Sequence, residues 1–184
     1  IIVTHGTDTM HYSSAALSFM LENLSIPVVF VGAQRSSDRG SSDAFLNLIC
    51  AAQFIINTNY SGVSICMHSN MSDDSCIILS GVKSKKLHSS RRDAFKVVND
   101  KPILEIDRNG KILSGKSKFA EKKEEFDVKF YKEGLKIGIL KSHPNMCSKE
   151  ISCFNGFDGL ILEGTGLGHF PINESNKGVF RELK

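Results

Sequence analysis

The sequence predicts an α/β fold built on a doubly wound, mostly parallel sheet. Short apolar segments that are typical of buried strands recur along the chain, and helix-length segments separate them. Polar clusters also follow some of these apolar segments directly. Because ligands of open α/β sheets gather at the carboxyl ends of the strands, we expect chemistry at these clusters.

The predicted elements of the first half follow one another without long gaps. Ser42 or Asp43 is a credible N-cap for the second helix, since both side chains can accept backbone hydrogen bonds there. A turn is predicted around Asp73 and Asp74, before the last apolar strand. The predicted elements are a strand at residues 1–4, helices at 13–24 and 43–56, and strands at 27–32, 62–67 and 76–81.

A charged segment at residues 109–134 predicts a domain boundary, because it is dense in charge and has no sustained period. We therefore place an N-terminal domain at 1–112, a linker at 113–134 and the beginning of a second, smaller α/β domain at 135–184. In the second domain, LKIGILKSHP and GLILEG predict strands on either side of a short helix. We expect both domains to be truncated, since the sequence begins inside an apolar strand and ends inside a predicted helix.

Composition excludes several classes of protein. The 184 residues are 41% hydrophobic, which predicts a globular chain with a real core. A net charge of +3, spread along the chain, gives no basic block of the kind that marks nucleic-acid binding. Five cysteines without a CxxC pair favour a reducing, cytoplasmic location, and no apolar run approaches the roughly 20 residues that span a membrane.

The cluster HGTDTM follows the first strand and is the main candidate for chemistry. A simpler interpretation is local, because Thr9 or Ser13 can cap the next helix. A catalytic threonine needs a proton acceptor, and VKSKKLHSSRRDAF offers three lysines, which spacing alone does not separate: Lys83, Lys85 and Lys86. We interpret His5 as packing or bonding the backbone rather than binding a metal.

Four blocks of the sequence resemble the type I asparaginase and glutaminase superfamily: HGTDTMHYSSAALSFML, VVFVGAQRSSDRGSSDAFLNLICA, KKLHSSRRDAFKVVNDKPI and GLILEGTGLGHFP. Within it, the strings MHYSSAALSFM, AQRSSDR and HSSRRDAF are most similar to the GatD family, the D-type subunits of archaeal glutamyl-tRNA(Gln) amidotransferases. The blocks occur in family order and span nearly the whole chain. The resemblance implies a type I asparaginase-like fold.

The same resemblance implies a catalytic triad of Thr7, Asp8 and Lys86. In that family the aspartate also binds the α-amino group of the substrate, and the threonine, with lysine as its proton acceptor, attacks the side-chain amide or activates water. Thr7 and Asp8 are thus the expected substrate-binding residues. The family's other catalytic threonine belongs to a TGGT-like loop upstream of HGTDT that this sequence lacks, so we expect these 184 residues alone to hydrolyse glutamine negligibly.

The function that the resemblance implies is that of a glutaminase subunit. It would release ammonia from glutamine, and a GatE-like partner would use that ammonia to convert Glu-tRNA(Gln) to Gln-tRNA(Gln). The partner would bind the tRNA and use ATP and Mg, while this chain would bind no cofactor or metal and form a homodimer. Two alternatives stay open: a free-standing type I L-asparaginase, and a noncatalytic amino-acid-binding or assembly module.

Overall fold

The computed structural model describes residues 1–120, 125–171 and 178. The chain forms two compact units, residues 1–130 and 131–184. The predicted division at 1–112, 113–134 and 135–184 stays a prediction, although a strand of the first unit runs to residue 115.

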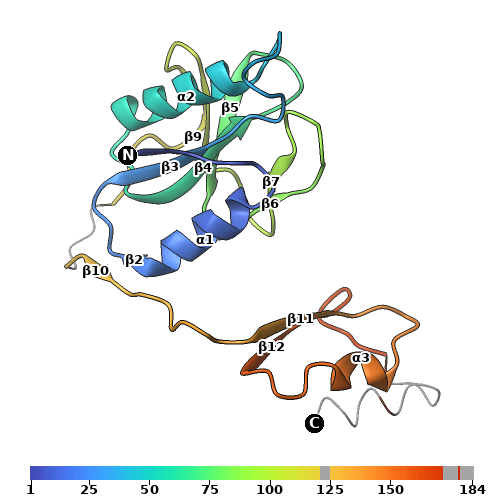
Figure 1. Cartoon of the computed structure of the whole chain (residues 1–184). Helices are drawn as coiled ribbons and strands as arrows, with labels where there is room; N and C mark the ends of the chain where they lie inside the picture. The colour runs from blue at the N-terminus through green and yellow to red at the C-terminus, as the bar shows by residue number, and fades with distance from the viewer. Residues whose placement is uncertain (121–124, 172–177, 179–184) are drawn as a thin grey trace. The chain divides into compact units, whose positions relative to one another are not determined.

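The first unit contains a six-stranded sheet with the order β1-β3-β4-β5-β8-β9 (Figure 1). Its middle strands are buried nearly end to end because both faces of the sheet are covered. Strand β1 lies at one edge of this sheet and β9 at the other. The strands are β1 (Ile2–Thr4), β3 (Pro27–Val31), β4 (Gly62–His68), β5 (Ser75–Ser80), β8 (Leu104–Asp107) and β9 (Ile112–Gly115).

The predicted α/β fold is confirmed, but the prediction of a mostly parallel sheet is wrong. Strands β1, β3 and β4 pair in parallel, whereas the β4–β5, β5–β8 and β8–β9 pairs are antiparallel. For the β4–β5 and β8–β9 pairs, the reason is the length of the connections. A parallel neighbour needs a crossover of about a dozen residues or more, and only residues 69–74 join β4 to β5.

Two helices cover opposite faces of the sheet, as a doubly wound fold requires (Figure 1). Helix α1 (Met10–Met20) packs through Met10, and helix α2 (Ala44–Asn57) packs through Phe54 on the other face. Helix α1 ends before the predicted residue 24, because the chain enters strand β2, which pairs with β10. These two strands are β2 (Leu21–Glu22) and β10 (Asp127–Val128). In the described residues, no helix is both long and apolar enough to cross a membrane.

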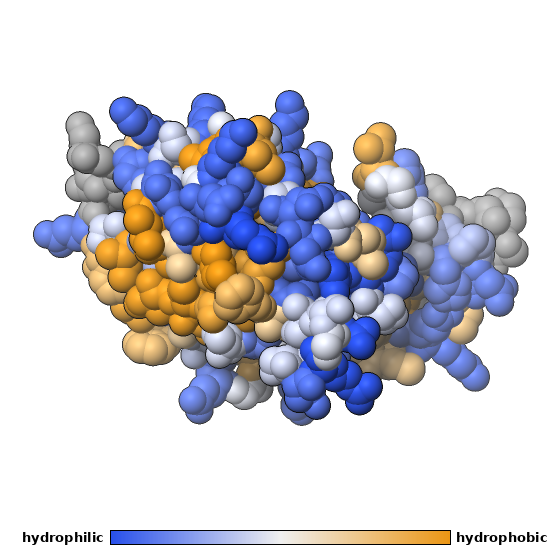
Figure 2. Space-filling model, turned by 90° about the horizontal axis from the view of Figure 1, so that it is seen from above, coloured by the Kyte–Doolittle hydropathy of each residue, from blue (hydrophilic) through white to orange (hydrophobic). Residues whose placement is uncertain are grey.

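Helix α2 is also apolar on its outward side. Its side chains Phe45, Leu48 and Ile56 are exposed, and Figure 2 shows apolar side chains gathered on the face seen from above, the side on which α2 lies in Figure 1. Not all of the apolar residues of α2 are therefore explained by packing against the sheet.

A short antiparallel hairpin brings the lysine-rich segment to the sheet. It consists of β6 (Ser84–Lys86) and β7 (Phe95–Val97), and Lys86 lies opposite Phe95. The Phe95 ring is fully buried in the same core cluster as Met10 of α1. The hairpin is therefore fixed by apolar packing, although most of its sequence is polar.

The second unit is a small βαβ arrangement. Strands β11 (Ile137–Lys141) and β12 (Gly159–Glu163) pair in parallel, and helix α3 (Ser148–Ser152) lies between them in the chain. Leu140 and Ile151 belong to its core cluster. The strand, helix and strand predicted for this part of the chain are confirmed.

Candidate active site

The first half of the candidate site is the segment that follows β1. The backbone N–H of His5 donates to the carbonyl of Val31 at 2.9 Å, so the parallel pairing with β3 continues to the start of HGTDT. As predicted, His5 bonds the backbone, with Nδ1 2.6 Å from the Gly6 carbonyl oxygen, and its ring packs edge-on against Phe30. Thr9 occupies the N-cap position of α1 but forms no side-chain capping bond.

The second half of the candidate site is Lys86, the last residue of β6. Its ammonium nitrogen Nζ lies 2.9 Å from Thr7 Oγ1 and 2.6 Å from Asp8 Oδ1. The structure thus brings together all three residues that the resemblance selected. It also distinguishes Lys86 from another candidate lysine, because Lys83 instead pairs with Asp100 at 2.8 Å.

The side chains of Lys86 and Asp8 differ sharply in exposure. The Lys86 side chain is 9% exposed, whereas that of Asp8 is 92% exposed. The hydrogen bond from Lys86, together with its positive charge, lowers the pKa of the Asp8 carboxyl below its usual value. A hydroxyl, a lysine amine and an ionised carboxylate within hydrogen-bond distance can bind an ammonium group and move a proton from a nucleophile.

His11 lies near this cluster, and the sequence reasoning passed over it because it has no metal-ligand spacing. Its Nδ1 atom is buried and has no hydrogen-bond partner in the part of the chain that the structure describes. Burial is the main cause that lowers the pKa of His11, and the charges of Lys85 and Lys86 lower it further.

Gln34 is a second residue that the sequence reasoning did not select. It lies in the loop after β3, and its amide nitrogen Nε2 donates to the backbone carbonyls of Arg91 at 2.8 Å and His88 at 3.4 Å. Both carbonyls belong to the segment that joins β6 to β7. The only sequence signal was the position of Gln34 inside AQRSSDR, one of the strings that carry the resemblance.

Metal ligands do not cluster in the described residues: no three or more His, Cys, Asp or Glu side chains there are placed to hold a metal ion. His68, the one fully buried histidine among the described residues, is bonded to protein atoms on both ring nitrogens.

A comparison with models of protein families assigns the chain to a family. The model of the N-terminal domain of asparaginase matches residues 1–118, which include β1, the hairpin and the whole candidate site. The chain belongs to the asparaginase family.

Among curated members of this family, the chain is similar to the GatD subunits of glutamyl-tRNA(Gln) amidotransferases. It is 46% identical to the GatD of Thermococcus kodakarensis in an alignment of 176 positions that covers 93% of this chain and 39% of that protein. It is 48% identical to that of Methanosarcina mazei, over 92% of this chain and 40% of that protein. The chain thus spans about two fifths of the length of these relatives.

Solved asparaginases share the fold over nearly the whole chain. The thermostable L-asparaginase of Thermococcus kodakarensis matches with a TM-score of 0.83 and 27% identity, covering 100% of this chain and 52% of the asparaginase. L-asparaginase I of Vibrio cholerae matches with a TM-score of 0.77 and 27% identity, over 99% of this chain and 52% of that one. This likeness confirms the asparaginase-like fold that the sequence predicted.

Proposed function

We propose that the chain carries one part of the catalytic site, Thr7, Asp8 and Lys86, of a glutaminase subunit that hydrolyses glutamine to ammonia for a tRNA-dependent amidotransferase. The observation that carries the proposal is the contact of Lys86 Nζ with both Thr7 Oγ1 and Asp8 Oδ1. The choice of glutamine follows from the relatives, since the chain is 46% identical to a GatD and 27% identical to an L-asparaginase whose fold it shares.

The proposed chemistry begins with Thr7 and Lys86. In its neutral form, the Lys86 amine accepts the proton of the Thr7 hydroxyl, or of a water molecule that Thr7 orders, and the oxygen attacks the side-chain amide carbon. The proton then passes to the amide nitrogen, which leaves as ammonia when the C–N bond breaks. Glutamate is released directly if water was the nucleophile, or after a water molecule hydrolyses the ester if Thr7 was. The position of Lys86 suits it to this role, because its Nζ lies within hydrogen-bond distance of the Thr7 hydroxyl.

Asp8 has a different proposed role. Its carboxylate is open to solvent, and its lowered pKa keeps it ionised at neutral pH. An ionised, accessible carboxylate beside the reacting hydroxyl suits the α-ammonium group of an amino-acid substrate. Asp8 thus orients the substrate, while Thr7 and Lys86 act on its amide.

The proposal extends to partners and location. A GatE-like subunit would bind Glu-tRNA(Gln), use ATP and Mg, and consume the ammonia to form Gln-tRNA(Gln). The chain itself would bind no cofactor, form a homodimer and work in the cytoplasm. Its six-stranded sheet and helices supply the glutaminase site only, which agrees with a net charge of just +3.

The experiment is a measurement of ammonia release from glutamine and from asparagine by the full-length protein. It is made with and without the GatE-like partner, ATP and Glu-tRNA(Gln). We expect glutamine hydrolysis to rise in the complete mixture. Fast hydrolysis of asparagine without any partner would instead support a free-standing L-asparaginase, the function that the solved structures of similar fold carry in their names.

Lys86→Ala and Lys85→Ala form a matched pair for the same assay. Both lysines lie on β6, but only Lys86 contacts Thr7 and Asp8. Loss of a general base costs about 10²–10⁴-fold in rate, so we expect a loss in this range for Lys86→Ala. Lys85→Ala should retain activity within about threefold, since a charge at an exposed position exerts a weak, screened effect. Equal activity of the two variants would refute the proposed chemistry.

A further inference from the structure

The tip of the hairpin, residues 87–92, is the part of the chain that follows Lys86 directly. At its base the backbone N–H of Leu87 donates to the Ala94 carbonyl at 2.8 Å. Beyond that bond, Gln34 holds the tip from the loop after β3, through its bonds to the carbonyls of His88 and Arg91. A three-residue strand on a two-stranded hairpin is marginal by itself, so such external bonds matter for its position.

Gln34 is in turn fixed by a buried carboxylate. Asp43 is fully buried, and its two oxygens accept the backbone N–H groups of Gln34 and Arg35, each at 2.9 Å. Asp43 stands at the N-cap position that the sequence predicted. Its carboxylate, however, bonds the backbone of the preceding loop rather than the backbone N–H groups of the first turn of the helix. The amide of Asn47, also fully buried, donates to Asp43 Oδ2 at 3.2 Å and to the Gly32 carbonyl at 2.9 Å.

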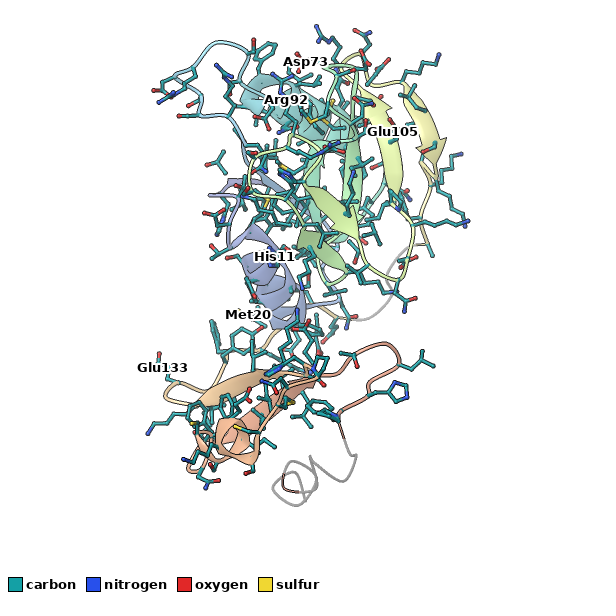
Figure 3. All side chains as sticks on the ribbon, turned by 90° about the vertical axis from the view of Figure 1, so that its right-hand side faces the viewer. His11, Met20, Asp73, Arg92, Glu105 and Glu133 are labelled. Carbon is teal, nitrogen blue, oxygen red and sulfur yellow. The ribbon has the colours of Figure 1, made fainter. Side chains whose placement is uncertain are left out.

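The bonds continue from Asn47 to the other side of the tip. Because the Asn47 amide nitrogen faces two oxygen acceptors, its oxygen Oδ1 accepts from His68 Nδ1 at 2.6 Å. His68 Nε2 lies 3.0 Å from Asp73 Oδ1, and Arg92 donates to that same oxygen at 3.0 Å. Figure 3 shows Asp73 and Arg92 close together. Arg92 is itself part of the tip and also donates to the Ser41 carbonyl.

These bonds close on themselves. From Gln34 in the loop after β3, the bonds lead to Asp43 and Asn47 at the start of α2 and then to His68 at the end of β4. They continue through Asp73, in the turn before β5, to Arg92 in the hairpin tip, which Gln34 also bonds. We call this set the anchoring circuit. Its side chains are Gln34, Asp43, Asn47, His68, Asp73 and Arg92.

We propose that Gln34 is a positioning residue for Lys86, holding the 87–92 tip through the anchoring circuit and so keeping the Lys86 amine against Thr7 and Asp8. This inference rests on the proposed function of Lys86. Three members of the circuit, Asp43, Asn47 and His68, are fully buried, so they form a rigid base. Gln34 is the half-buried link between that base and the hairpin tip.

Gln34→Met removes the amide donors at nearly constant length. Gln53→Met is the matched control, because Gln53 lies on α2 and its amide oxygen accepts from Asn57 rather than bonding the hairpin. In the full-length protein with its partner, we expect Gln34→Met to lower kcat for glutamine by about 10- to 100-fold, since a misplacement of about 1 Å costs up to about 10² in rate. KM should change less than about twofold, because Asp8 is untouched.

Hydrogen exchange supplies a readout independent of activity. In Gln34→Met, the amides of residues 87–92 should exchange at least about tenfold faster, while the amides of β4 and β5 stay protected. Gln53→Met should change neither kcat nor this exchange. Equal kcat for the two variants, or faster exchange throughout the sheet, would overturn the inference.

Lys86→Ala in the same assay distinguishes a failure of the proposed function from a failure of the positioning role of Gln34. If Lys86→Ala retains activity, the proposed function fails. If Lys86→Ala is inactive while Gln34→Met keeps the kcat of the unmodified protein, only the positioning role of Gln34 fails. A raised KM with unchanged kcat would also refute positioning of Lys86, because it would place the effect on substrate binding.

Discussion

The two halves of the candidate site differ in how firmly the fold holds them. Lys86 is 9% exposed and lies on a hairpin that is packed by Phe95 and bonded by Gln34, whereas Asp8 is 92% exposed at the end of an edge strand. A proton acceptor must be placed accurately against the group it serves, and an ammonium-binding carboxylate must stay accessible. The fold therefore fixes the base and leaves the carboxylate open.

Phe95→Ala gives the largest effect expected from this difference. The ring is fully buried directly opposite Lys86, and removal of a buried phenylalanine ring costs about 3–5 kcal/mol of stability. Phe19→Ala, at a side chain 64% exposed on α1, should cost less than about 0.5 kcal/mol. Urea unfolding of both variants measures this contrast. Similar losses for the two would show that the hairpin is not fixed by its core packing.

Asn47→Ala comes next, because it leaves buried partners without hydrogen bonds. Asp43 and His68 would each lose a bond, at a cost of about 2–4 kcal/mol in the free energy of unfolding. Asn57→Ala is the control at the exposed end of α2, where the amide bonds only its own helix in the described residues. We expect a loss below about 1 kcal/mol there. The same urea experiment compares them.

Replacement of Asp93 should have a smaller effect on stability, and that effect should depend on pH. Hydrogen bonds from Arg91 and then Lys96, and the charges of both, hold the pKa of its carboxyl far below the usual value. A lowered folded-state pKa stabilises the protein above the unfolded pKa of about 4 and loses this contribution as the pH falls through the folded value. Asp93→Asn should therefore cost about 1 kcal/mol at pH 7 and progressively less below about pH 4. A constant difference between pH 7 and pH 3 would contradict this origin.

Asp8→Asn should have the smallest effect on stability. Its side chain is solvent-exposed, so we expect the urea midpoint to match that of the unmodified protein while glutamine turnover falls. The measurement pairs urea unfolding with ammonia release. A fall in the midpoint as large as that of Asn47→Ala would remove the distinction between a fixed base and an open carboxylate.

Local patterns predicted most of the elements. The apolar runs predicted β3, β4 and β5. The direction of β5 was wrong, because apolar runs do not encode strand direction. The signal lay in connection length, since the six residues between β4 and β5 permit a hairpin but no crossover.

Only some residues of the candidate site could be predicted from the sequence. Thr7 and Asp8 could be selected as polar residues after a strand, and the resemblance alone singled out Lys86 among three lysines. Gln34 and His11 were not selected. Gln34 acts at long range in sequence, and no local period marks a side chain whose partner is the backbone of residue 91.

By itself, the sequence determined the α/β class, the strands and helices from β1 to β5 except β2, and the polar cluster after β1, because these depend on local hydrophobic periodicity and turn chemistry. Only the tertiary structure decided the antiparallel half of the sheet and the contact of Lys86 with Thr7 across 79 residues. The tertiary structure alone also brings together the residues of the anchoring circuit that bond the hairpin tip. Hydrogen bonds between distant segments depend on how those segments pack, and packing is a property of the whole fold.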